Sequence, residues 1–285
     1  MATFYNQATL SFGRTVTSSN VTEGEVLGGL TLTKTAATES YAPGDGITYV
    51  INIVNNGTSA VEGLVLTDDL GAYTVPGGTT RVTPLTYVPG SVLYYRDGAL
   101  AEAPEVTAGD TLVISGITVP ASGNATVIYE ARANEFAPLG AGSAITNTVS
   151  ADGELCDELT DSATVGTRDE ARLTIAKAIC PAVVTCSGEV TYTLIVQNTG
   201  NTPALATDNA IIRDVFTPAL SDITVTLDGV ELEEGVGYSY NEETGEFATT
   251  EGAVPVPAAT YVRDPETGIV TTTPGVAVLT VTGTA

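Results

Sequence analysis

Several residue types are rare or missing in this chain of 285 residues, which has no histidine, no tryptophan, one methionine and three cysteines. Without histidine, enzymes that use an imidazole as general base or metal ligand are excluded. The lack of tryptophan disfavours a polysaccharide-active enzyme, which needs a carboxylate pair in an aromatic-lined cleft. The cysteines are too few for a disulfide scaffold and badly spaced for zinc. We therefore expect no cofactor, no metal centre and no enzymatic activity.

Basic residues are also scarce. Ten lysines and arginines stand against 34 acidic residues, a formal charge of −24, so nucleic acid is not an expected partner. No apolar run approaches the length of a membrane helix, so we expect no membrane partner either. Residues 1–6 lack the basic and apolar parts of a signal peptide. The route of export is left open between a removed leader, export without a leader, and release when the cell lyses.

What the chain does contain points to β-structure. Threonine, valine, alanine and glycine dominate, and clusters of glycine or proline interrupt the chain at short intervals. Helical periodicity is nearly absent, whereas short alternating or β-branched runs recur between these turn signals. This pattern is typical of an all-β sandwich.

One stretch occurs twice and organises the rest. Residues 47–57 reappear as residues 190–200, 143 positions later, each a β-branched and aliphatic run around a tyrosine that ends in Asn-x-Gly. Such a run predicts a buried strand entering a turn. Further segments match in the same order: 30–34 with 173–177, 65–68 with 211–214, and the hairpin signal Asp97-Gly98 with Asp228-Gly229. The chain therefore predicts two tandem immunoglobulin-like (Ig-like) β-sandwich repeats.

The second repeat has no counterpart of the segments that close the first, at 145–150 and 162–165. A matching segment stands at the other end, because residues 6–10 resemble residues 147–151. We interpret residues 1–28 as an N-terminal donor strand or hairpin, 29–168 as repeat 1, and 169–285 as repeat 2 without its closing strands. Two alternatives stay open: an extra edge strand on repeat 1, and closure onto repeat 2 of the same chain.

The motifs resemble a known bacterial family. Lys34, residues 44–49, 55–57, 65–68 and 145–149 are similar to the "conserved repeat" domain of unknown function eleven, which is related to isopeptide-forming fimbrial and adhesin domains. Similar proteins occur on Gram-positive cell surfaces and in the spore appendages of clostridia. The resemblance covers both repeats and implies an extracellular location, at a cell or spore surface. This chain lacks the C-terminal sorting motif of wall-anchored adhesins, which favours a self-assembling appendage subunit.

The related domains use a lysine, an acidic residue and an asparagine to form an isopeptide bond, which suggests a role for three residues here. Lys34 lies on the first strand of repeat 1, Asn147 on its closing strand, and Asp68 on a strand between them. First and last strands can be neighbours in an Ig-like sandwich. A buried lysine loses its charge and becomes a nucleophile, and a protonated aspartate could polarise the carboxamide. Alternatively, Lys34 is a solvated strand residue and Asn147 a turn former.

The second repeat offers Lys177 and Asp214 but no closing asparagine, so Asn6 of another copy would have to supply it. Separately, Cys180 and Cys186 could close a small disulfide loop, or all three thiols could crosslink copies. Buried free thiols are the alternative.

We therefore expect a structural subunit of an extracellular or spore-surface filament. Copies would join head to tail by donation of the N-terminal strand into repeat 2 of the next subunit, and Lys–Asn isopeptide bonds would seal them. The expected partner is the protein itself, with other appendage or surface proteins as further candidates. The alternative is a fragment of a surface adhesin or binding module whose Ig-like domains are self-contained.

Overall fold

The computed structural model describes residues 2–26, 29–153, 159–184 and 188–285. The described chain consists of β-strands joined by turns, with one 3-10 turn at η1 (Ala206–Asp208). It divides into two compact units, the first mainly residues 1–138 and 143–167, the second mainly residues 168–264 and 270–285. The expectation of an all-β protein with Ig-like sandwiches is confirmed.

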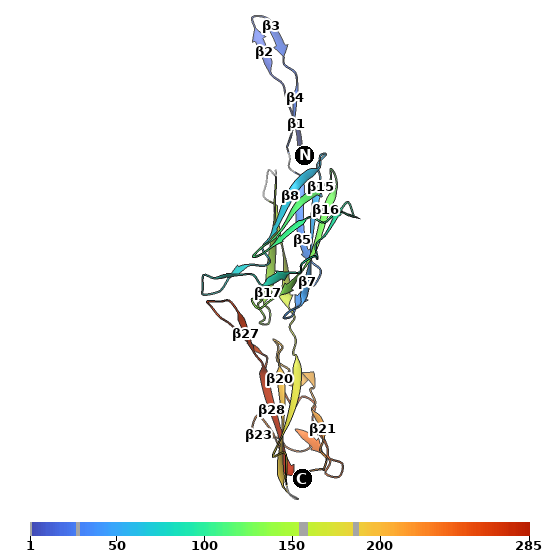
Figure 1. Cartoon of the computed structure of the whole chain (residues 1–285), viewed down its shortest axis with the longest axis vertical. Helices are drawn as coiled ribbons and strands as arrows, with labels where there is room; N and C mark the ends of the chain where they lie inside the picture. Colours follow the sequence, from blue (N-terminus) through green and yellow to red (C-terminus); the bar gives the residue numbers. More distant parts are fainter. Residues whose placement is uncertain (1, 27–28, 154–158, 185–187) are drawn as a thin grey trace. The chain divides into compact units, whose positions relative to one another are not determined.

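The first unit contains a sandwich of two sheets (Figure 1). One sheet has the order β13 (Ala99–Leu100), β12 (Leu93–Arg96), β16 (Asn124–Ala133), β7 (Gly46–Asn55), β5 (Leu30–Ala36), with β11 (Leu85–Tyr87) also on β16. The other has the order β14 (Glu105–Ala108), β15 (Leu112–Val119), β8 (Val61–Asp68), β17 (Ala144–Asp152), β18 (Leu159–Thr167), β6 (Ser40–Tyr41). The first unit also contains a separate two-stranded sheet of β9 (Tyr73–Thr74) and β10 (Arg81–Val82).

The second unit repeats part of this plan. Its larger sheet has the order β19 (Leu173–Cys180), β20 (Glu189–Asn198), β28 (Gly275–Thr284), β22 (Ser221–Leu227), β23 (Val230–Glu231). Its smaller sheet has the order β21 (Arg213–Val215), β25 (Glu246–Thr249), β24 (Tyr238–Tyr240), and β26 (Thr260–Arg263) pairs with β27 (Val270–Thr273). No described strand stands where β17 and β18 stand in the first unit.

The repeated stretch is the central strand of each larger sheet. β7 lies between β16 and β5, and β20 lies between β28 and β19. The ladders share one register, since Lys34 lies opposite Ile51 and Lys177 lies opposite Leu194. Alternate residues of β7 are buried, from Ile47 to Asn55, because successive side chains of a strand point to opposite faces. The sequence repeat is therefore also a repeat of strand pairing.

Residues 2–26 form a hairpin of four strands that pair with one another, dark blue in Figure 1. β1 (Ala2–Asn6) pairs with β4 (Thr22–Val26), and β2 (Thr9–Phe12) pairs with β3 (Thr15–Ser18). The side chains of residues 4–23 are exposed. Among the described residues, this hairpin shares no ladder with either sandwich.

Local predictions are confirmed in the turns but not at one strand. Asp97-Gly98 and Asp228-Gly229 both have positive φ and connect hairpins, as a type I′ turn requires. The strand expected at 211–214 begins instead at Arg213. The N–H of Ile212 bonds to Oγ1 of Thr249 at 2.9 Å, so a side chain takes the place of a ladder partner there.

A buried asparagine ends each central strand and ties the following turn to it. The carboxamide oxygen of Asn198 accepts the N–H groups of Gly200 and Arg172, each at 2.9 Å. Its nitrogen donates to the carbonyls of Thr202 and Pro257, at 2.8 and 3.1 Å. Asn55 repeats the pattern, accepting from Gly57 and donating to Ser59 and Val119. This explains why Asn-x-Gly recurs at the end of both copies.

We expect Asn198→Ala to lower the free energy of unfolding of the second unit by about 2–4 kcal/mol, because four main-chain groups lose a buried partner. Urea unfolding followed by circular dichroism, with hydrogen exchange at β20, measures the loss. Asn241→Ala is the control, since Asn241 is exposed and its oxygen accepts the N–H of Glu243 at 2.9 Å. Equal losses for the two variants would contradict the role assigned to Asn198.

Candidate functional site

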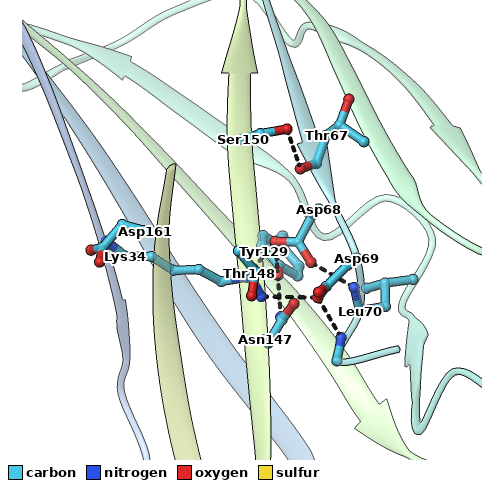
Figure 2. Close-up of polar contacts among 11 residues, drawn as sticks. Lys34, Thr67, Asp68, Asp69, Leu70, Tyr129, Asn147, Thr148, Ser150 and Asp161 are labelled. Atoms are coloured by element: carbon cyan, nitrogen blue, oxygen red, sulfur yellow. Dashed lines mark hydrogen bonds and ion pairs between the residues drawn. The ribbon is translucent and has the colours of Figure 1, made fainter. Parts of the chain in front are cut away.

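The three residues singled out from the sequence lie together in the interior of the first sandwich (Figure 2). Lys34 comes from β5, Asp68 from the end of β8, and Asn147 from β17. All three are buried, because each occupies an inward position of its strand's alternation. The alternative, a solvated Lys34 and an Asn147 in a turn, is wrong.

Lys34 is enclosed on every side. Its Nζ contacts Oδ2 of Asp68 at 2.6 Å, and the side chains are 0% and 1% exposed. The same nitrogen lies 4.9 Å from the ring centre of Tyr49 and 6.0 Å from that of Tyr129. The main-chain N–H of Lys34 donates to Oδ2 of Asp161 on β18 at 2.6 Å. β18 therefore covers the edge of β5 at this residue.

Burial shifts both members of the pair toward their neutral forms. Desolvation lowers the pKa of Lys34, an effect that the charge of Asp68 only partly opposes. Desolvation likewise raises the pKa of Asp68, against the effect of Lys34. Burying a charged pair in so dry a site costs desolvation free energy, and the electrostatic attraction between the two charges hardly offsets that cost. The arrangement thus favours an uncharged amine, which is nucleophilic, beside a protonated carboxyl group.

A tyrosine that the sequence interpretation did not include stands between the acid and the asparagine. The hydroxyl of Tyr129, on β16, donates to Oδ2 of Asp68 at 2.6 Å. It accepts the Nδ2–H of Asn147 at 2.9 Å. Asp68 was expected to polarise the carboxamide of Asn147, and the hydrogen bonds between these two residues run through Tyr129. The other oxygen of Asp68 accepts the N–H of Leu70 at 3.0 Å.

Two buried polar atoms beside this chain of hydrogen bonds have no partner among the described residues. They are the hydroxyl of Tyr49 and the carboxamide oxygen of Asn147. Tyr49 lies on β7 directly opposite Tyr129, and their rings stack with centres 5.4 Å apart. Burial raises the pKa of both hydroxyls, so both stay protonated. The site thus holds an amine, a carboxyl group, a carboxamide and two phenols in an interior closed to water.

The second unit holds half of the same site. Nζ of Lys177 contacts Oδ2 of Asp214 and lies 4.5 Å from the ring centre of Tyr192, the counterpart of Tyr49. The side chains of Lys177 and Asp214 are 38% and 17% exposed. Val281 lies opposite Tyr192, in the place that Tyr129 takes opposite Tyr49. No described asparagine of this unit takes the place of Asn147.

Asn6 and the cysteines are not brought to these sites. Asn6 lies on β1, exposed and paired with Thr22 within the hairpin. Cys180 is exposed at the end of β19. The disulfide suggested for Cys180 and Cys186 involves residue 186, which lies outside the described residues, as does Cys156.

Two general features of the described residues complete the survey. They contain no group of three or more histidine, cysteine or acidic side chains placed to hold a metal ion. They also include no helix with the length and apolar character needed to cross a membrane.

Comparison with known proteins gives weak likenesses. No protein-family model and no curated protein sequence matches the chain. Among solved structures, the major pilin BcpA of Bacillus cereus is 13% identical, with a TM-score of 0.38 over 96% of this chain and 73% of that one. The major pilin SpaD of Corynebacterium diphtheriae is 12% identical (TM-score 0.35; 85% and 58% covered). The collagen-binding domain of a Staphylococcus aureus adhesin is 11% identical (TM-score 0.29; 50% and 99% covered). At these scores the likenesses carry no argument about function.

The burial of Lys34 against Asp68 leads to a prediction that does not depend on formation of an isopeptide bond. In an Asn147→Ala background, Asp68→Ala should lower the free energy of unfolding of the first unit by about 3–5 kcal/mol, because Lys34 keeps its amine but loses its acid. Adding Lys34→Met should recover most of that loss, since an apolar side chain of similar length replaces the amine. Thermal unfolding of the three variants measures both effects. Failure of Lys34→Met to restore stability would mean that Lys34 is not the reason for the loss.

Proposed function

We propose that this protein is a structural subunit of an extracellular filament on a cell or spore surface. Copies join head to tail when the N-terminal hairpin of one subunit, residues 1–28, completes the second sandwich of the next. Lys–Asn isopeptide bonds then lock the subunits. The proposal rests on the geometry of the chain itself, and its main support is the different exposure of equivalent residues in the two sandwiches.

Equivalent strands are covered in the first sandwich and bare in the second. Leu32 on β5 is 9% exposed, whereas its counterpart Ile175 on β19 is 56% exposed. The Lys34 side chain is 0% exposed and that of Lys177 is 38% exposed. In the first unit β18 lies beside β5, while β17 pairs with β8. In the second, the described strands leave the corresponding edges of β19 and β21 unpaired.

The bare region is an apolar groove. Its volume is about 170 Å³, and its lining includes Leu173, Ile175, Val196, Ile212, Val254 and Val256. An unpaired strand edge beside exposed apolar side chains is a template for a further strand. A two-stranded segment that placed one strand on β21 and the other beside β19 would restore the arrangement of the first sandwich.

The N-terminal hairpin has the spacing that this role requires. Asn6 lies opposite Thr22, 16 residues further along the chain, and Asn147 lies opposite Ala163, also 16 residues further. With the two asparagines aligned, alternate residues of the hairpin's first arm, which comprises β1, residues 7 and 8, and β2, match β17 in kind: Phe4 with Ile145, Asn6 with Asn147, Ala8 with Val149, and Leu10 with Ala151. The β17 residues of this set are buried, while the hairpin residues are exposed.

Hydrophobic burial favours this docking. A donated hairpin that buries roughly 500 Å² of apolar surface would gain at most about 12 kcal/mol before ordering costs. The contact joins two different surfaces, so each added copy offers a new free groove and a new free hairpin. Contacts of this kind extend into a filament unless the rotation closes a ring.

A covalent step would follow burial in each sandwich. In the first, Nζ of Lys34 attacks the carboxamide carbon of Asn147, an amide forms, and ammonia leaves. In the second, docking would place Asn6 of the incoming hairpin beside Lys177 and Asp214. The cover of the docked hairpin would also remove Lys177 from water, the condition under which Lys34 becomes neutral.

The bond within the first sandwich predicts a change in mass. We expect the intact protein to be lighter than its sequence by one ammonia for each bond formed. Asn147→Ala should abolish the loss in the first sandwich and lower its thermal stability. Asn52→Ala is the control, because Asn52 lies on β7 and accepts a hydrogen bond from Thr126 outside the site. An unmodified mass for folded wild-type protein would exclude the bond and leave strand donation to be judged separately.

Strand donation predicts that the two faces of the hairpin differ in importance. Leu10→Asp should stop polymerisation, because it places a charge on the face that enters the groove, whereas Ser11→Asp, on the opposite face, should leave it unchanged. Deleting residues 1–22 should also stop it, and a peptide of those residues should bind the second sandwich of the truncated protein. Electron microscopy and light scattering follow assembly.

Filaments that form without residues 1–22 would rule out the mechanism. A monomer whose own hairpin covers its second sandwich at every concentration would favour closure within one chain, and hence the self-contained binding module.

A further inference from the structure

Tyr129 belongs to the buried hydrogen-bond chain, yet it is neither of the two residues that the proposed bond joins. It is fully buried, it stacks on Tyr49, and its hydroxyl touches both Asp68 and Asn147 (Figure 2). The proton of this hydroxyl goes to Asp68, so its oxygen is free to accept and the Nδ2–H end of the carboxamide faces it. The hydroxyl is therefore 2.9 Å from the nitrogen that leaves as ammonia.

Asp68 makes no direct hydrogen bond to that nitrogen. Its Oδ2 contacts Nζ of Lys34 and accepts a hydrogen bond from the hydroxyl of Tyr129, both at 2.6 Å. Its Oδ1 accepts the N–H of Leu70 at 3.0 Å. A proton that leaves Asp68 for the departing amine has a continuous path through the Tyr129 hydroxyl. Both contacts of that hydroxyl are within the range of a working proton transfer.

We propose that Tyr129 is a catalytic acid of the isopeptide reaction, relaying a proton from Asp68 to the leaving nitrogen of Asn147. This inference rests on the proposed function, since it assumes that the Lys34–Asn147 bond forms. The proposed reaction then involves Tyr129 besides the lysine, the acid and the asparagine. The step of Tyr129 is the proton transfer to the leaving nitrogen.

The protons balance along this route. Nζ of neutral Lys34 attacks Cγ of Asn147, so an N–C bond forms and the π pair of the carbonyl moves to Oδ1. The lone pair of Nδ2 is no longer conjugated and becomes basic. The Tyr129 hydroxyl then turns its proton from Asp68 toward the Nδ2 lone pair, gives that proton to Nδ2, and takes one from protonated Asp68. The pair on Oδ1 then re-forms the carbonyl, the Cγ–Nδ2 bond breaks, and Nδ2 leaves as ammonia. The extra proton on Nζ passes to Asp68 across the 2.6 Å contact, which restores both Asp68 and Tyr129.

The second sandwich supplies a natural comparison. Val281 stands where the relay residue stands in the first sandwich, so the described residues around Lys177 and Asp214 offer no phenol opposite Tyr192. A bond between Lys177 and a docked Asn6 would have to form without the relay. We therefore expect it to form more slowly than the bond between Lys34 and Asn147, and we expect Val281→Tyr to accelerate it.

The experiment times the first bond in the full chain. Cell-free synthesis is pulsed and chased, samples are denatured at intervals, and digestion with mass spectrometry gives the fraction of Lys34 joined to Asn147. We expect Tyr129→Phe to slow the reaction by about 10²-fold or more, the typical contribution of a positioned acid. Tyr94→Phe is the control, because the hydroxyl of Tyr94 bonds to Thr118 at 2.6 Å in the same unit, away from the site.

A second measurement separates chemistry from folding. Thermal unfolding of Lys34→Ala is compared with that of the Lys34→Ala, Tyr129→Phe double variant, neither of which can form the bond; similar midpoints mean that the phenylalanine is accommodated. A fluorotyrosine placed at position 129 keeps the shape and the hydroxyl but is a stronger acid. We expect bond formation to return at a rate that changes with the acidity of the phenol. A purely structural role of the hydroxyl would restore the wild-type rate whatever the acidity.

The outcomes are distinct. A wild-type chain that never joins Lys34 to Asn147 would overturn the proposed bond itself. A wild-type chain that joins them, with Tyr129→Phe at the same rate, would overturn the relay alone. A folded Tyr129→Phe chain that links at least about 10²-fold more slowly, together with a rate for fluorotyrosine that differs from that of tyrosine, is the result that supports the relay.

Discussion

The burial of Lys34 against Asp68 is the constraint on which the site depends. A lysine with a fully covered side chain is tolerated only if its charge is paired or lost, and here desolvation favours its loss. The same desolvation raises the pKa of Asp68. The fold therefore keeps the amine and the carboxyl group, which under the proposed function are the nucleophile and the acid, in contact within the sandwich core. Under the proposed function, stability and reactivity would be two consequences of one buried contact.

The two sandwiches show what that contact needs from its surroundings. Lys177 and Asp214 come together as Lys34 and Asp68 do, on equivalent strands in the same register. What differs is the cover: β17 and β18 close the first site, while the second remains open to solvent over β19. An incomplete sandwich would thus keep its lysine hydrated until a strand arrives, which would couple the covalent step to assembly.

The sequence was informative where the evidence lay in local pattern. Asn-x-Gly after a β-branched run indicated both central strands, and the structure adds the reason, because Asn55 and Asn198 each tie a turn to the strand end. Lys34, Asp68 and Asn147 could be selected by residue type and strand order. Tyr129 could not, although it lies in a strand that the alternation predicted. An inward tyrosine in a β-sandwich is ordinary, and only the contacts of its hydroxyl with Asp68 and Asn147 distinguish Tyr129 from the others.

The sequence by itself determined the all-β class, the twofold repeat and the chemical types of the candidate residues, because these follow from composition and from periods of two and of 143 residues. The tertiary structure decided which hydroxyl stands between Asp68 and Asn147, and which lysine is sealed and which is exposed. The two-residue period of a strand tells which face a side chain occupies. The partner it meets there depends on ladder register and on strands far away in the chain.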